Sequence, residues 1–310
     1  MAVIRPSSAS PWSTRNNQDE AAAATRRKQR AARRFGRKSL ITLAVALLSF
    51  IFFLPFLWMV STSLKIDPEV YQIPPVWIPR SFRLANYFEA MTYVPFGRYV
   101  LNTLQYGILS DIGVVLSSAV CAYSFSRLQW KGRDALFAIV LATMMVPYQV
   151  TMIPLYLIFK RLNWLNTYLP MVVPNYLGSA YFIFMLRQFF MTIPMELSDA
   201  ARIDGCSELR IFTSVILPLS KPALAVVALF RFMDCWNDYM GPLIYLRDTK
   251  KYTVALGLQH LRQYGTAASV EQVWPHLMAA STVVTLPVVL LYFFTQRTFV
   301  EGIALTGIKG

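Results

Sequence analysis

Long apolar runs decide what this chain can fold into. The first of them, residues 40–60, is almost purely apolar. A helix rises 1.5 Å per residue, so a run of this length reaches about 30 Å, the thickness of the hydrocarbon core of a bilayer. Because backbone polar groups find no water there, a spanning segment must bond them internally, which favours helices. The sequence therefore predicts an all-α polytopic membrane protein.

Further apolar runs give the predicted number of spans. The candidates are residues 99–123, 135–159, 169–190, 223–246 and 277–294. Several prolines interrupt the second and third of these, so their ends are the least defined. Only 15% of the residues are charged, against about 25% in an ordinary soluble domain. Six transmembrane helices in total would leave both termini on the same side of the membrane.

The distribution of basic residues indicates the orientation. The formal net charge of +14 could suggest nucleic-acid binding, but eight of the 30 Lys and Arg residues lie between Arg26 and Lys38, directly before the first apolar run. Such a block marks the cytoplasmic end of a span. We therefore expect the N-terminus and, with six spans, the C-terminus to be cytoplasmic.

These expectations divide the chain into segments. They are a disordered basic cytoplasmic tail (1–38), the first transmembrane helix (39–62), an ordered extracytoplasmic loop rich in Pro and aromatic residues (63–97), a five-helix core (98–298) and a cytoplasmic C-terminal tail (299–310). The core includes a cytoplasmic polar segment, residues 191–222, which lies between two spans.

The polar segment has the pattern of two short helices joined by a turn. Pro194 is suited to a helix start, and Gly205 to a helix end. Ser207 can cap a second helix, in which an apolar stripe follows at helical spacing. The stripe consists of Ile211, Phe212, Val215 and Ile216.

The first of these helices carries a face of small side chains. Leu197, Ala200, Ala201 and Asp204 share this face, while Asp199 and Arg202 are spaced for an ion pair. The face has no Trp or Phe that could insert among lipid headgroups. It suits a groove on another protein better than the surface of a bilayer.

The amino-acid sequence of this segment also resembles that of a known protein family. "DAARIDGCSELRIFTSVILPLSKP" resembles the EAA loop of ABC importer permeases, with Asp199 where the family usually has Glu. "PYQVTMIPLYLIFKRLNWLNTY" (147–168), "WNDYMGPLIYL" (236–246) and "FVEGIALTGIKG" (299–310) resemble the carbohydrate-uptake permeases of the maltose-transporter second-subunit type. The four motifs follow the family's order along most of the chain.

The resemblance implies a type I ABC importer permease fold and a role for the polar segment in coupling to an ATPase. The positions that match the motif are Asp199, Ala200, Ala201, Asp204, Gly205, Ile216, Leu217 and Pro218. It also implies that the C-terminal tail reaches the ATPase through Gly307, Lys309 and Gly310. The shorter carboxylate of Asp199 could weaken or shift an ion pair with that partner.

The implied assembly lies in a prokaryotic cell membrane. Its other members are a second homologous permease, a cytoplasmic ATPase dimer that holds ATP and Mg²⁺, and an extracytoplasmic binding protein for a sugar or polyol. "GIALTGIKG" at residues 302–310 lacks the Ser or Thr of a phosphate-binding loop and the helix that should follow it. The chain is therefore expected to be a non-catalytic subunit that binds no cofactor of its own.

Polar and aromatic residues in the spans are candidates for the transport path, because such groups are costly in lipid. The set comprises Asn102, Tyr148, Gln149, Asn175, Tyr176, Trp236, Asn237 and Asp238. Asp111 has no assigned role. Arg231 and Asp234 are spaced for an internal pair, or for a contact between permease subunits.

Two other function classes were weighed against an ABC permease. An ion-coupled secondary transporter would use Asp111, Arg231 and Asp234 as a relay, and it predicts repeats with broken helices, which the sequence does not show. A membrane-embedded enzyme would need a metal site or a Ser/His set. The only histidines, His260 and His276, have no partners at metal-site spacing.

Overall fold

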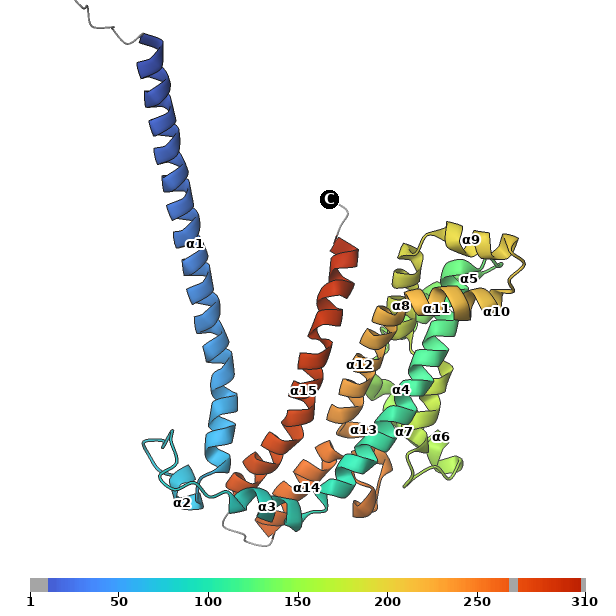
Figure 1. Ribbon diagram of the computed structural model, residues 1–310. Helices are drawn as coiled ribbons and strands as arrows, with labels where there is room; N and C mark the ends of the chain where they lie inside the picture. Colours follow the sequence, from blue (N-terminus) through green and yellow to red (C-terminus); the bar gives the residue numbers. More distant parts are fainter. Residues whose placement is uncertain (1–10, 268–272, 308–310) are drawn as a thin grey trace, which may run out of the picture. The chain divides into compact units, whose positions relative to one another are not determined.

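The computed structural model describes residues 11–267 and 273–307, and the regular elements in this part of the chain are all helical (Figure 1). The described chain divides into two compact units, one ending at Trp58 and the other beginning at Met59. This agrees with the predicted all-α fold class.

The longest helix, α1, runs from Pro11 to Ser63. Its apolar part, Gly36–Ser63, has a mean hydropathy of 2.6 and exposed side chains throughout most of its length. This is the first predicted span. Residues 11–38, for which we expected no regular structure, are helical. Their Ala, Arg, Lys and Gln residues are strong helix formers, and a helix that already exists in the span extends at little cost.

The second unit begins with two short helices in the segment predicted as an ordered loop. They are α2 (Asp67–Val70) and α3 (Ala85–Tyr93). Asn86 is fully buried, and its amide donates hydrogen bonds to the carbonyls of Ser63 and Lys65 at 2.9 and 2.8 Å. These bonds tie α3 to the chain that leaves the first span.

The central helix of the second unit is α4, Phe96–Arg127. It packs against α8 (Ala180–Thr192) and α12 (Lys221–Asn237). Small residues on α4 allow these close approaches: a methyl group on Gly107 would lie 3.6 Å from Cβ of Cys235. The shared core of these helices includes Leu186 and Val227, both fully buried.

Two pairs of helices meet at sharp bends, one within the predicted span 135–159 and one where the polar segment joins the predicted span 223–246. α5 (Arg133–Thr143) and α6 (Tyr148–Arg161) meet at 94°, at a break that contains Pro147. The segment of α10 to α11 (Glu208–Leu219) meets α12 at 78°. Pro at a helix start and the restricted residue before it favour such breaks.

The remaining helices complete the second unit. They are α7 (Leu169–Val172), the 3₁₀ helix η1 (Val173–Leu177), α9 (Met195–Ile203), α10 (Glu208–Ile211), the π-helix η2 (Phe212–Ile216), α11 (Leu217–Leu219), α13 (Met240–Tyr245), the 3₁₀ helix η3 (Thr249–Lys251), α14 (Val254–Ala267) and α15 (Val273–Gly307).

Four described helices are long and apolar enough to cross a membrane, or up to six if each bent pair is one span. The second of these numbers matches the six spans predicted. The predicted fifth span, 223–246, is divided: α12 ends at Asn237 and α13 begins at Met240. The sequence did not predict α14, whose apolar residues follow a helical period over a length too short for a span.

Candidate functional site

The polar segment folds as the sequence predicted, as a helix, a glycine turn and a second helix. Pro194 is the N-cap of α9, and Gly205 adopts the left-handed conformation at φ +78° that ends it. The hydroxyl of Ser207 accepts a hydrogen bond from the backbone N–H of Arg210 and so caps α10. Figure 1 shows these helices at one end of α4.

The apolar stripe of the second helix anchors the segment. Ile211, Phe212 and Ile216 are buried, and they pack with residues of α4, α8 and α12 in one cluster. The predicted small-residue face is only partly exposed. Leu197 and Ala200 are exposed, whereas Ala201 is half-buried against the same cluster. The exposed apolar surface is completed by Ile203 and Leu209 at either side of the turn.

A polar network joins the segment to α4. Arg202 forms the predicted ion pair with Asp199 at 2.7 Å, and a second pair with Glu208 at 2.7 Å. Tyr123, on α4, lies 2.5 Å from the other carboxylate oxygen of Glu208. The hydrogen bond from Arg202 holds the pKa of Glu208 below its usual value, and the bond from Tyr123 acts in the same direction. The carboxylate therefore links the two helices of the segment to α4.

Sequence reasoning missed Arg127, the last residue of α4. Its side chain is buried and donates hydrogen bonds to the carbonyls of Phe190 and Ile193, where α8 ends. A weaker contact reaches the carbonyl of Pro194 at 3.5 Å. The carbonyl of Phe190 also accepts the backbone N–H of Ile193, the C-cap of α8, so the guanidinium adds to this closure of the helix and fixes the start of α9. Only the position of Arg127 at the end of a span could have pointed to it.

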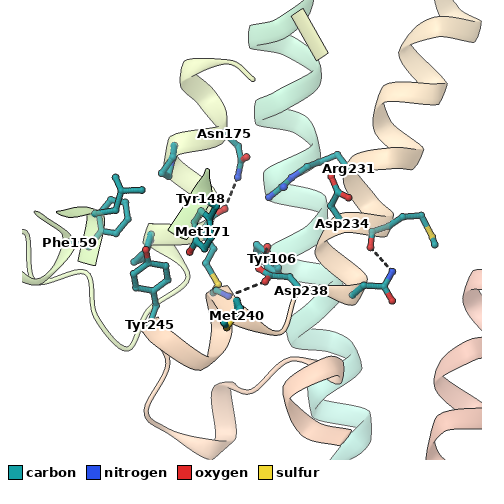
Figure 2. Close-up of a pocket in the computed structure, with 16 residues that line it drawn as sticks. Tyr106, Tyr148, Phe159, Met171, Asn175, Arg231, Asp234, Asp238, Met240 and Tyr245 are labelled. Atoms are coloured by element: carbon teal, nitrogen blue, oxygen red, sulfur yellow. Dashed lines mark hydrogen bonds between the residues drawn. The ribbon is translucent and has the colours of Figure 1, made fainter. Parts of the chain in front are cut away.

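A cavity of about 770 Å³ lies among α4, α6, α7, α12 and α13 (Figure 2). Four of the predicted path residues line it: Tyr148, Asn175, Asn237 and Asp238. The cavity is also lined by four residues that were not predicted: Tyr106, Met171, Met240 and Tyr245. They come from helices that are far apart in sequence, and sequence alone gave no sign of their meeting.

Hydrogen bonds fix part of the cavity wall. The hydroxyl of Tyr106 donates to Oδ2 of Asp238 at 2.9 Å, and the backbone N–H of Gly241 donates to Oδ1 at 3.0 Å. The amide of Asn175 donates to the carbonyl of Met171 at 2.6 Å. Figure 2 shows Asp238 between Tyr106 and the start of α13. The carboxylate thereby holds the break between α12 and α13.

Four predicted path residues do not line the cavity. Asn102 donates to the carbonyls of Lys250 and Tyr252, so it supports η3. Trp236 is buried in a different cluster, where its indole donates to the carbonyl of Val284. The remaining two, Gln149 and Tyr176, also lie outside the set of lining residues, and Tyr176 packs across Gly113.

Arg231 and Asp234 both line the cavity but do not form the expected pair. Arg231 interacts electrostatically with Asp234 and also with Asp111 on α4, yet the ion pairs of the described residues do not include it. Its Nε atom is buried without a hydrogen-bond partner. In Figure 2 its side chain extends from α12 toward α4.

Two other groups of predictions can be placed. Among the residues that the structure describes, no group of three or more His, Cys, Asp or Glu could hold a metal ion. Gly307 is the last residue of α15, while Lys309 and Gly310 lie outside the described residues.

Apolar spans around a mainly apolar cavity that carries a few polar and charged side chains define a class of protein: a helical membrane protein built for transport. The family of binding-protein-dependent transport system inner membrane components matches residues 113–304. The chain belongs to this family.

Relatives extend the similarity to most of the chain. An arabinooligosaccharides transport system permease protein of Halalkalibacterium halodurans is 32% identical, over 87% of this chain and 96% of its own length. An sn-glycerol-3-phosphate transport system permease protein of Pectobacterium atrosepticum is 32% identical, over 76% of this chain and 85% of its own.

The fold matches a solved structure. A chain of a bacterial ABC transporter involved in the import of the acidic polysaccharide alginate superposes with a TM-score of 0.74, covering 86% of this chain and 97% of that one at 23% identity. The fold is therefore that of an ABC importer permease.

Proposed function

We propose that this chain is the permease subunit of an ATP-driven importer for a saccharide or related polyol. Family membership and the names of its relatives support this. The chain would pair with a homologous permease and receive its substrate from an extracytoplasmic binding protein. ATP and Mg²⁺ would bind to a separate ATPase dimer on the cytoplasmic side.

The observation that carries the mechanism is the construction of the polar segment. It presents exposed Leu197, Ala200, Ile203 and Leu209 on α9 and α10, while Ile211 and Ile216 are fully buried beneath them. An exposed apolar surface on a firmly packed base suits a partner that pushes on it. ATPase closure would move α9, and the packed cluster together with Glu208 would pass that movement to α4.

The transport path would follow the cavity. Tyr148 offers a ring face, and Asn175 and Asn237 offer amides, in the lining. Sugars bind through ring stacking combined with a few placed hydrogen bonds. Alternating access would expose this cavity to one side of the membrane at a time.

Ala200→Asp tests the coupling assignment. Ala200 is exposed, so the carboxylate should leave the fold intact and disrupt only docking. We expect weaker co-purification of the ATPase and loss of uptake. Thr249→Asp, at an exposed residue of η3, is the matched control and should change neither.

Unchanged association and uptake for Ala200→Asp would contradict the coupling role. Uptake that continues after deletion of the ATPase gene would instead identify an ion-coupled secondary transporter.

A further inference from the structure

Relatives of equal similarity name substrates of opposite character. The arabinooligosaccharides of one are uncharged, whereas sn-glycerol-3-phosphate of the other is an anion, and both proteins are 32% identical to this chain. Overall similarity therefore leaves the charge of the substrate open. The cavity wall offers a more direct criterion, because it is the surface that the substrate must contact.

Acidic groups outnumber basic groups in this wall. Asp234 and Asp238 line the cavity together with a single basic residue, Arg231, among the described lining residues. Behind Arg231, on α4, lies a further carboxyl group, that of Asp111. Like charges in a cleft with low-dielectric walls reinforce one another.

Arg231 is poorly placed to bind an anion. It interacts with Asp111 and Asp234, and its Nε is buried without a partner. The bidentate fork that makes Arg effective on phosphate and carboxylate needs its N–H groups open to the ligand. The described ion pairs do not include Arg231, but the negative charges of these two carboxyl groups offset its attraction for an incoming anion.

The other polar groups suit hydroxyl groups. The hydroxyl of Tyr148 can donate and accept, as can the amides of Asn175 and Asn237. None of them requires a charge on the ligand. The flat ring face of Tyr148 matches the apolar face of a pyranose or furanose.

We propose that the substrate passing this cavity is an uncharged saccharide, and that the carboxylates of Asp234 and Asp238 exclude acidic sugars and sugar phosphates. The inference deepens the proposed function and rests on it. Asp234 is the residue that selects by charge, since Asp238 is held by Tyr106 and Gly241.

The electrostatic potential of the cavity can be measured in the complete transporter. In a background with Cys121, Cys206 and Cys235 replaced by Ala, Asn237→Cys places a thiol in the cavity wall. The rate at which this thiol reacts with the cationic trimethylammonium-ethyl methanethiosulfonate is compared with its rate of reaction with the anionic sulfonatoethyl methanethiosulfonate. A small free thiol in the same buffer supplies the reference ratio.

We expect the cation-to-anion rate ratio to exceed the reference by roughly 250-fold, because one unit charge about 10 Å away at an effective dielectric of 20 changes the rate of each reagent by about 16-fold, in opposite directions. Asp234→Asn should lower the ratio and Asp234→Glu should preserve it. Arg231→Gln should raise it. Asp134→Asn removes a carboxylate that lies outside the cavity, in an exposed pair with Arg133, and should have no effect.

A ratio at or below that of the free thiol would overturn the proposal, as would uptake of sn-glycerol-3-phosphate or an oligouronate as fast as that of a neutral oligosaccharide. A thiol that neither reagent reaches, with or without ATP, would remove the cavity from the path and overturn it too. Each outcome is separate from the test of coupling, because ATPase co-purification does not depend on the cavity.

Discussion

Replacing Arg127 by Met removes the donors that close the C-terminal end of α8 while keeping an unbranched side chain of similar length. The guanidinium is 3% exposed and donates to the carbonyls of Phe190 and Ile193, the latter at 2.6 Å. In the variant the carbonyl of Ile193 loses this donor and that of Phe190 keeps only the backbone N–H of Ile193, in a region that admits little water. The turn between α8 and α9 should therefore loosen.

The size of the effect follows from the two short hydrogen bonds. A bond from a charged donor contributes about 1.5–3 kcal/mol, so the pair contributes about 3–6 kcal/mol. Removing the guanidinium also removes the cost of burying it, which offsets part of this loss. We expect a net destabilisation of about 3 kcal/mol, equivalent to a melting temperature lower by about 6–12 °C by the scaling of soluble domains.

Thermal unfolding of the purified transporter measures this prediction. Arg210→Met is the control, because Arg210 is exposed on α10 and its loss should change the melting temperature by less than about 2 °C. Arg127→Lys retains the charge but not the forked guanidinium, so its melting temperature should lie between those of Arg127→Met and the native protein. A melting temperature for Arg127→Met equal to that of Arg210→Met would refute the capping role.

Three other outcomes are expected. Gly205→Ala places a side chain at φ +78°, which costs about 1–2 kcal/mol; it should weaken ATPase co-purification, and an unchanged yield would contradict the role of the turn. Because Arg202 lowers the pKa of Glu208 from 4.5, the stability from this pair is complete above pH 4.5 and lost as pH falls through the lowered pKa. Glu208→Gln should therefore flatten the decline of melting temperature between about pH 4.5 and 3, and an unaltered decline would exclude this carboxylate. Asn102→Ala should lower the melting temperature, because the hydrogen bonds to the carbonyls of Lys250 and Tyr252 are lost. The apparent Km for uptake should not change. A raised Km would show that Asn102 contributes to the transport path.

Local patterns explain what could be predicted from the sequence. Apolar length alone located the spans, and the turn at Gly205 with the cap at Ser207 follows from rules that act within a few residues. The Asp199–Arg202 pair is likewise one helical turn apart. The bends are less predictable, since a proline indicates that a helix is interrupted but not by what angle.

Contacts between distant segments explain what could not be predicted. Tyr106 meets Asp238 across 132 positions in the chain, and Arg127 meets Ile193 across 66. A tryptophan such as Trp236 has the chemistry of a sugar platform, but its helix turns it into a core cluster instead. Residue type gave eight candidates, of which four line the cavity, because the rotation of each helix decides which side chains reach it.

The cavity is built largely where helices are interrupted. Tyr148 directly follows the break at Pro147, Asn175 lies in the 3₁₀ helix η1, and Asp238 follows the last residue of α12. Residues at such breaks are less constrained by helix packing than those within α4 or α8. Evolution could therefore alter the cargo of a transporter of this kind by substitutions at these joints while the membrane-spanning framework and its coupling to the ATPase remain intact. One scaffold could in this way serve relatives whose cargoes have little chemistry in common.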